Sequence, residues 1–112
     1  MYAVVRDNTF DPTRRADSPD AVQAFRAAHA AQPGYRGSIV VDAEGGRELS
    51  ITLWASRADA EAARVALGPV IGRTLGPLMA IPSTLVGLGE VAFDDLTSAD
   101  LARAPPPARL NA

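Results

Sequence analysis

Three side chains at alternating positions near the middle of the chain could form the wall of a ligand-binding site. They are Ser50, Thr52 and Trp54, the only tryptophan among the 112 residues. Side chains of a β-strand alternate between two faces, so these three share one face if the strand is regular. A flat indole could stack on an aromatic substrate while the hydroxyls donate hydrogen bonds to its oxygens. Alternatively, Trp54 lies in an interface or a core, and the hydroxyls belong to a half-wet sheet.

Two arginines could hold an anionic oxygen. Arg73 is the only charged residue between Val65 and Gly89, and its guanidinium could stabilise a phenolate, an enolate or a reduced form of O2. Arg6 shares one face of a predicted first strand with Asn8, and both could position substrate oxygens. The alternative for Arg73 is an exposed side chain whose aliphatic stem lies along its helix.

The single histidine, His29, is the candidate general base, because the pKa of imidazole lies close to neutral pH. It follows Val22 by seven residues and Phe25 by four, so it borders the apolar stripe of a predicted helix. A histidine at such a position is more often a packed residue at the edge of a helix.

The sequence contains no pattern that predicts a metal site or a cofactor. Cysteine is absent, and no His, Asp or Glu residues cluster at metal-ligand spacing. The glycine-rich segments do not form a phosphate-binding loop. We therefore expect no disulfide, no metal and no cofactor, and any chemistry falls to the side chains described above.

Composition and charge argue against several partners. The formal net charge is -2, without the dense basic face that nucleic-acid binding needs. The segment 65–89 is largely apolar, but its three prolines and five glycines predict a broken helix and a strand rather than a membrane span. The first residues lack the basic start and apolar run of a signal peptide, so we expect a cytoplasmic protein.

Six predicted elements would position the candidate residues. Ser18 and Ser56 are suitable N-caps for two helices, and a break at Gly68-Pro69 would divide the second helix into two pieces. We expect strands at 2–10, 35–42, 48–54 and 84–93, and helices over 19–31 and from 57 onward. The order βαββαβ predicts a ferredoxin-like α+β fold, with a four-stranded antiparallel sheet and both helices on one face.

The strand 48–54 also predicts how the sheet divides its two faces. Leu49, Ile51 and Leu53 alternate with the row that ends at Trp54. We expect the aliphatic row to lie against the helices and the Trp54 row to lie on the face that the chain does not cover. With Val86, Leu88 or Val91 nearby, that open face would be an apolar patch larger than soluble monomers usually expose. A second copy packed sheet against sheet would bury it, so we expect a homodimer.

Three segments of the chain resemble the antibiotic biosynthesis monooxygenase domain, a family of the dimeric α+β barrel superfamily. They are P-G-Y-R-G-S at 33–38, L-W-A-S at 53–56 and R-A-D-A-E at 57–61. The resemblance covers roughly residues 1–94 in element order and is specific over 33–61. It implies a dimeric α+β barrel domain at 1–95, followed by a partly flexible C-terminal extension at 96–112.

The resemblance also carries expectations for the site. It implies that Trp54 borders a pocket between sheet and helices, and that an arginine near Arg73 acts in relatives that oxidise polyketides. Cofactor-free relatives tend to have an asparagine at a place like that of Ser50, so the serine is a departure. Haem-degrading relatives need a histidine from the second helix, near Arg64 here, so haem chemistry of that kind is not expected.

Two functions from different classes follow. The first is a cofactor-independent monooxygenase that acts on a small aromatic or polyketide-like substrate and O2, with Trp54, Arg73 and His29 as catalytic candidates. The second is a non-catalytic dimeric module of the same fold that binds a small ligand or serves assembly. An isomerase or cyclase could use the same pocket without O2. A shared fold does not decide among them.

Overall fold

A computed structural model describes residues 1–96 of the chain. Apart from Leu96, the C-terminal extension predicted for 96–112 lies outside the described residues. The elements in chain order are β1 (Tyr2–Phe10), α1 (Pro12–Ala16), α2 (Pro19–Ala30), β2 (Tyr35–Asp42), β3 (Arg47–Trp54), α3 (Arg57–Arg73), the short 3-10 helix η1 (Gly76–Leu78) and β4 (Met79–Glu90). The predicted βαββαβ order is confirmed, with the small helix α1 added in the first loop.

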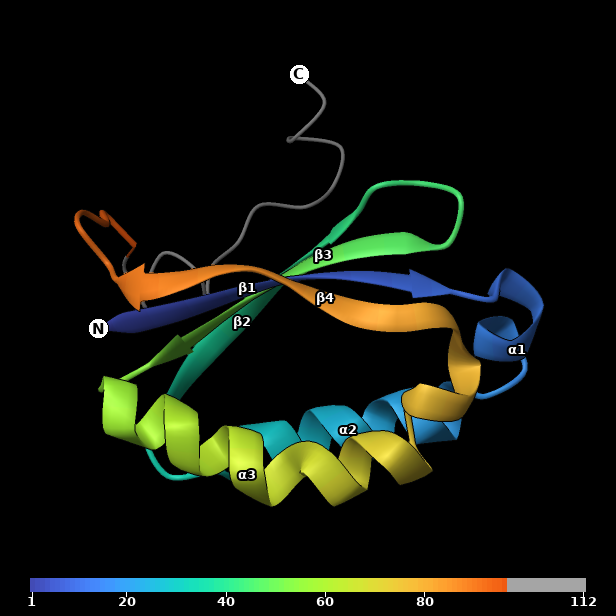
Figure 1. Cartoon of the computed structure of the whole chain (residues 1–112), viewed down its shortest axis with the longest axis horizontal. Coiled ribbons are helices and arrows are strands. Elements are labelled where there is room, and N and C mark those ends of the chain that lie inside the picture. Colours follow the sequence, from blue (N-terminus) through green and yellow to red (C-terminus); the bar gives the residue numbers. More distant parts are fainter. Residues whose placement is uncertain (97–112) are drawn as a thin grey trace.

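The four strands form one antiparallel sheet in the order β2-β3-β1-β4. The helices α2 and α3 lie side by side beneath one face of this sheet, and no helix covers the opposite face within residues 1–96 (Figure 1). The predicted α+β architecture with helices on one face is therefore confirmed. No helix in the described part of the chain is long and apolar enough to cross a membrane.

Two helix starts follow from local side-chain chemistry. The Ser56 hydroxyl accepts a hydrogen bond from the Asp59 backbone N–H at 3.1 Å and donates one to the Asp59 carboxylate at 3.0 Å. This confirms the predicted cap of α3. Ser18 precedes α2 but makes no capping bond with its side chain, while Pro19 takes the first helical position as predicted.

The predicted break at Gly68-Pro69 is wrong, because α3 continues through both residues to Arg73. Proline lacks the N–H that would bond to the carbonyl of Val65 one turn earlier. Val65, Gly68 and Pro69 are exposed, so water can satisfy that carbonyl. The helix ends one turn later, where the Thr74 hydroxyl donates to the Val70 carbonyl at 2.7 Å.

The last strand begins earlier than predicted, at Met79 rather than Thr84, and runs past Pro82. Strand β4 lies at the edge of the sheet, where a proline can be accommodated without loss of an interior ladder bond. Its register against β1 shifts near Pro82 and again near Val86. The earlier start brings Ser83 into the sheet opposite the first strand.

The assignment of the two sheet faces is opposite to the prediction. Trp54 is only 2% exposed and packs in one core cluster with Tyr2 and with Ala60, Ala63 and Leu67 of α3. The row Glu48, Ser50, Thr52 and Trp54 therefore faces the helices. The aliphatic row Leu49, Ile51 and Leu53 faces the open side. The prediction failed because alternation identifies which residues share a face, but not which face the helices cover.

Candidate functional site

A cavity of about 560 Å³ lies between the sheet and the helices. Members of two separate core clusters line it: Trp54 and Leu67 belong to one cluster, and Phe10 and Val22 belong to the other. The volume is in the range of small-molecule binding sites. The polar row of β3 faces inward because this space is not filled by apolar side chains.

An aromatic cluster forms one end of the cavity. The rings of Trp54 and His29 stack with centroids 5.4 Å apart and an interplanar angle of 29°. Tyr35 meets Trp54 edge to face at 5.6 Å, and Phe25 meets His29 in the same way at 5.1 Å. The Trp54 indole N–H donates to the Thr52 hydroxyl at 3.2 Å, which fixes the orientation of the indole. Because the indole is only 2% exposed and already stacks on His29, the cluster forms a packed aromatic wall at this end of the cavity.

Burial within this cluster lowers the pKa of His29 below its ordinary value of 6.5, because an apolar environment disfavours the charged ring. The imidazole makes no side-chain hydrogen bond to any other residue in the range 1–96. At neutral pH the ring is therefore uncharged and has a nitrogen lone pair available to accept a proton. His29 has the chemical character of a general base, although no neighbouring group orients it.

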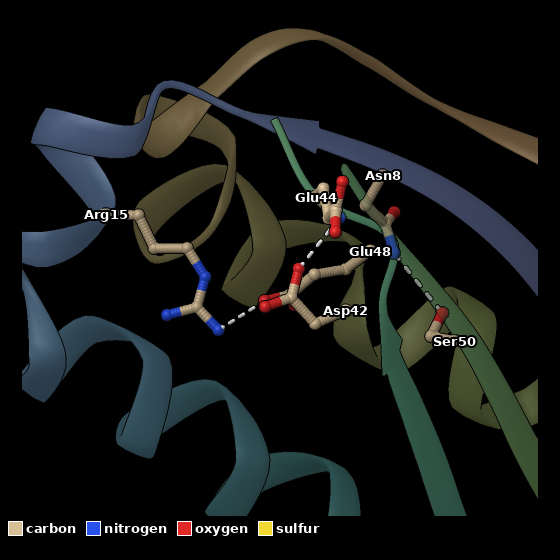
Figure 2. Close-up of polar contacts among 6 residues, drawn as sticks. All are labelled: Asn8, Arg15, Asp42, Glu44, Glu48 and Ser50. Carbon is tan, nitrogen blue, oxygen red and sulfur yellow. Dashed lines mark hydrogen bonds and ion pairs between the residues drawn. The ribbon is translucent and has the colours of Figure 1, made fainter. Parts of the chain in front are cut away.

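A chain of hydrogen bonds crosses the sheet side of the cavity. Arg6 Nε donates to the Ser83 hydroxyl at 2.8 Å, and the Ser83 hydroxyl donates to Asn8 Oδ1 at 2.6 Å. Asn8 Nδ2 then donates to the Ser50 hydroxyl at 3.3 Å (Figure 2). These four residues come from β4, β1 and β3, and all of them line the cavity. We call this set the polar relay.

The far end of the cavity holds an ion pair. Arg15 donates to the Glu48 carboxylate at 2.8 Å (Figure 2). Its guanidinium lies 5.2 Å from the ring centre of Phe10. Glu48 thus compensates the charge of Arg15. By contrast, no carboxylate among residues 1–96 lies within 4 Å of the Arg6 guanidinium, which therefore contributes an uncompensated positive charge to the cavity.

The structure brings six of the seven sequence-derived candidates to this one cavity. Arg6, Asn8, His29, Ser50, Thr52 and Trp54 all line it. Arg73 does not: it is exposed in the last turn of α3 and is absent from the described residues that line the cavity. Because α3 is continuous, its cavity-facing side at this end is formed by Leu67, Gly68 and Ile71.

Sequence reasoning missed Ser83, Tyr35, Phe25 and Arg15 as parts of the site. Ser83 was placed before the last strand, so nothing connected it with β1. Tyr35 belongs to the P-G-Y segment, and its position directly opposite Trp54 on the neighbouring strand could have been found from the hairpin register. Phe25 lies one helical turn before His29, a spacing at which side chains meet.

Several solved structures share this fold. A candidate antibiotic biosynthesis monooxygenase from Nitrosomonas europaea is 17% identical, with a TM-score of 0.66 over 83% of this chain and 100% of that chain. A variant of SnoaB, a cofactor-independent oxygenase from Streptomyces nogalater, is 17% identical, with a TM-score of 0.65 over 84% and 95%. A Nitrosomonas europaea protein of unknown function is 13% identical, with a TM-score of 0.69 over 87% and 94%.

No family model and no curated protein matches the chain. The solved structures support the resemblance to antibiotic biosynthesis monooxygenases at the level of fold. At these identities they do not define what the chain acts on. The function has to be argued from the cavity itself.

Proposed function

We propose that this chain is a cofactor-independent monooxygenase that acts on a small aromatic or polyketide-like substrate. The observation that carries the proposal is the cavity, which is lined both by the Trp54–His29 stack and by a polar relay that begins at an uncompensated arginine. An electron-rich aromatic substrate needs a flat surface, a base and donors for the oxyanion that forms on deprotonation. The fold shared with the SnoaB oxygenase is consistent with this class of reaction.

In the proposed reaction, neutral His29 removes a proton from an acidic position of the substrate, such as the ring CH2 of an anthrone-like compound. The resulting enolate is held through its oxygen by donors on the sheet side, and it supplies the electrons that reduce O2. One oxygen atom enters the substrate as a carbonyl, and the other leaves as water with the two hydrogens of the oxidised carbon. The side chains contribute positioning, proton acceptance and anion stabilisation.

We also propose that two copies assemble through the open face of the sheet. Ile39 and Val41 are each 45% exposed there, Ile81 is 56% exposed, and the row Leu49, Ile51 and Leu53 lies between them. The same face carries the Arg47–Asp7 ion pair at 2.8 Å between Leu49 and Ile81. Exposed aliphatic rows on a sheet without a covering layer are unfavourable in water, and a two-fold pairing of identical faces would bury them. The absence of cysteine is consistent with a cytoplasmic location, which we propose for the assembly.

Oxygen uptake tests the proposed reaction. Purified protein is incubated with an anthrone or a quinol, and O2 consumption is compared with the spontaneous rate. We expect the wild-type protein to consume O2 faster than the spontaneous rate. His29→Phe and Trp54→Phe should each reduce this excess at least tenfold, because a general base usually contributes about 100-fold or more. Arg73→Gln is the matched control and should retain the wild-type rate, because Arg73 lies outside the cavity.

The second candidate is a non-catalytic dimeric module that binds a small ligand. The observation that favours it is the lack of any described group that hydrogen-bonds to His29 and orients it. Saturable binding of the same compounds without O2 uptake above the spontaneous rate would support this candidate and contradict the oxygenase.

A further inference from the structure

We infer that Arg6, acting with the polar relay, makes this cavity selective for planar aromatic ligands that carry an anionic oxygen together with a second oxygen acceptor. The inference deepens the proposed function by naming its ligand class, and it rests on that function only for the aromatic nature of the ligand. It comes from the direction of the hydrogen bonds rather than from their number.

The direction is imposed by the arginine. A guanidinium can only donate, so the Ser83 oxygen must accept from Arg6 Nε at 2.8 Å. The hydroxyl hydrogen of Ser83 is then directed to its other partner, Asn8 Oδ1, at 2.6 Å. Because the Asn8 amide oxygen accepts the hydrogen bond from Ser83, the NH2 group of the same amide points toward Ser50. Each hydrogen bond in the relay polarises the next one, so the charge of the arginine makes the Ser50 hydroxyl a stronger hydrogen-bond donor.

Ser50 is the end of the relay. Its oxygen accepts from Asn8 Nδ2, and its hydroxyl hydrogen has no acceptor among the side-chain hydrogen bonds of residues 1–96. Ser50 faces the cavity, so this hydrogen is available to a ligand oxygen. A serine in isolation could donate or accept, whereas a serine that already accepts from an amide is biased toward donation.

Arg6 provides a second donor beside it. Arg6 and Ser50 lie directly opposite each other in the register of β1 and β3, so their side chains emerge as cross-strand neighbours on the cavity side. The guanidinium uses Nε for Ser83 and Nη2 for a long contact of 3.5 Å with the Ser83 carbonyl. Its Nη1 makes no hydrogen bond within the described part of the chain. A neutral donor from β3 and a charged donor from β1 thus line the same cavity, which suits a ligand that carries an enolate or phenolate together with a carbonyl oxygen.

The test is a binding titration without O2 turnover, monitored by the fluorescence of the only tryptophan, which lies in the cavity wall. The probe is 2-hydroxy-1,4-naphthoquinone, an enolate beside a carbonyl at neutral pH, and the neutral comparison is 1,4-naphthoquinone. The sequence contains no cysteine, and all eleven of its basic residues are arginines, so thiol and lysine adducts with the quinone do not arise. We expect the anionic probe to bind more tightly than the neutral one.

Ser50→Ala should weaken binding of the anionic probe by about 10- to 100-fold, the effect of losing one hydrogen bond to a charged group. Ser83→Ala leaves Ser50 in place but interrupts the relay, so it should weaken binding of the anionic probe by about 3- to 10-fold. Ser83→Thr restores a hydroxyl and should recover the affinity. Arg6→Gln should remove the preference for the anion. The neutral probe should bind each variant as it binds the wild type.

Two controls keep the outcomes separate. Ser18→Ala removes a serine hydroxyl and Arg73→Gln removes a guanidinium, both outside the cavity, so neither should change the affinity for the anionic or the neutral probe. Circular dichroism verifies that every variant is folded. An unchanged affinity for the anion in both Ser83→Ala and Arg6→Gln would overturn the inference. If the protein prefers the anionic probe but shows no O2 uptake above the spontaneous rate, the inference about the relay is supported and the oxygenase proposal is contradicted.

Discussion

On strand β3, the two faces of the sheet are reversed relative to the usual pattern of an α+β protein. The helix-covered face carries the polar row of β3 together with Arg6 and Asn8, and the open face carries the aliphatic row. A covered face is normally apolar because it packs against helices. Here a cavity separates part of the sheet from α2 and α3, so polar groups can lie inside, while the aliphatic row on the outside has no covering layer within residues 1–96. In the function proposed above, the covered face binds the ligand and the open face serves assembly.

The largest expected effect comes from placing a charge on the open face. In a two-fold interface, Ile51→Asp introduces two carboxylates, each of which costs about 3 kcal/mol or more when buried without a partner. We expect sedimentation equilibrium to find a dimer for the wild type and a monomer for this variant at micromolar concentration. Val65→Asp is the control, because Val65 is 67% exposed on α3, and that variant should remain dimeric. A dimeric Ile51→Asp protein would show that assembly uses another surface.

A second expected effect concerns the covered face. Trp54 is 2% exposed in a core cluster, so Trp54→Ala should lower the free energy of unfolding by about 3–5 kcal/mol, the usual cost of truncating a buried aromatic residue. Urea unfolding followed by circular dichroism at fixed protein concentration measures the loss. Val65→Ala should change it by less than about 0.5 kcal/mol. A loss below about 1 kcal/mol for Trp54→Ala would mean that the indole is not packed as described.

The smallest expected effect is a pH dependence specific to the aromatic cluster. Because the pKa of His29 is lowered on folding, the unfolded chain binds more protons than the folded chain as pH falls through 6.5. Stability should therefore be fully present above pH 6.5 and should decline below it. The pKa of the carboxyls of Asp7 and Asp11 is lowered from 3.8, so their contribution is lost only at more acid pH.

Thermal denaturation between pH 5 and pH 7.5 isolates the histidine, because these two carboxylates stay ionised in that range. We expect the slope of stability against pH to decrease in His29→Phe, which keeps an aromatic ring of similar size. An equal slope in the wild type and in this variant would contradict burial of the imidazole.

Much of the fold could be predicted from the sequence, since element order follows from local patterns such as the Ser56 cap and the alternation of β3. The same alternation correctly grouped Ser50, Thr52 and Trp54, but it contains no information on which face the helices cover. Arg73 was grouped with the site because it is the only charge between Val65 and Gly89 and because the resemblance implies an arginine nearby, yet it is exposed in the last turn of α3 and does not line the cavity. The relay could not be predicted, because Ser83 reaches Asn8 only through pairing between strands 75 residues apart.

The comparison of the two faces is tested most directly by the fluorescence of Trp54 during titration with 2-hydroxy-1,4-naphthoquinone. If the covered face is the ligand face, quenching should saturate with a defined dissociation constant in the wild type and in Ile51→Asp alike, because the open face takes no part in binding. Quenching that rises linearly with ligand in both proteins, without saturation, would contradict a binding site beside this indole.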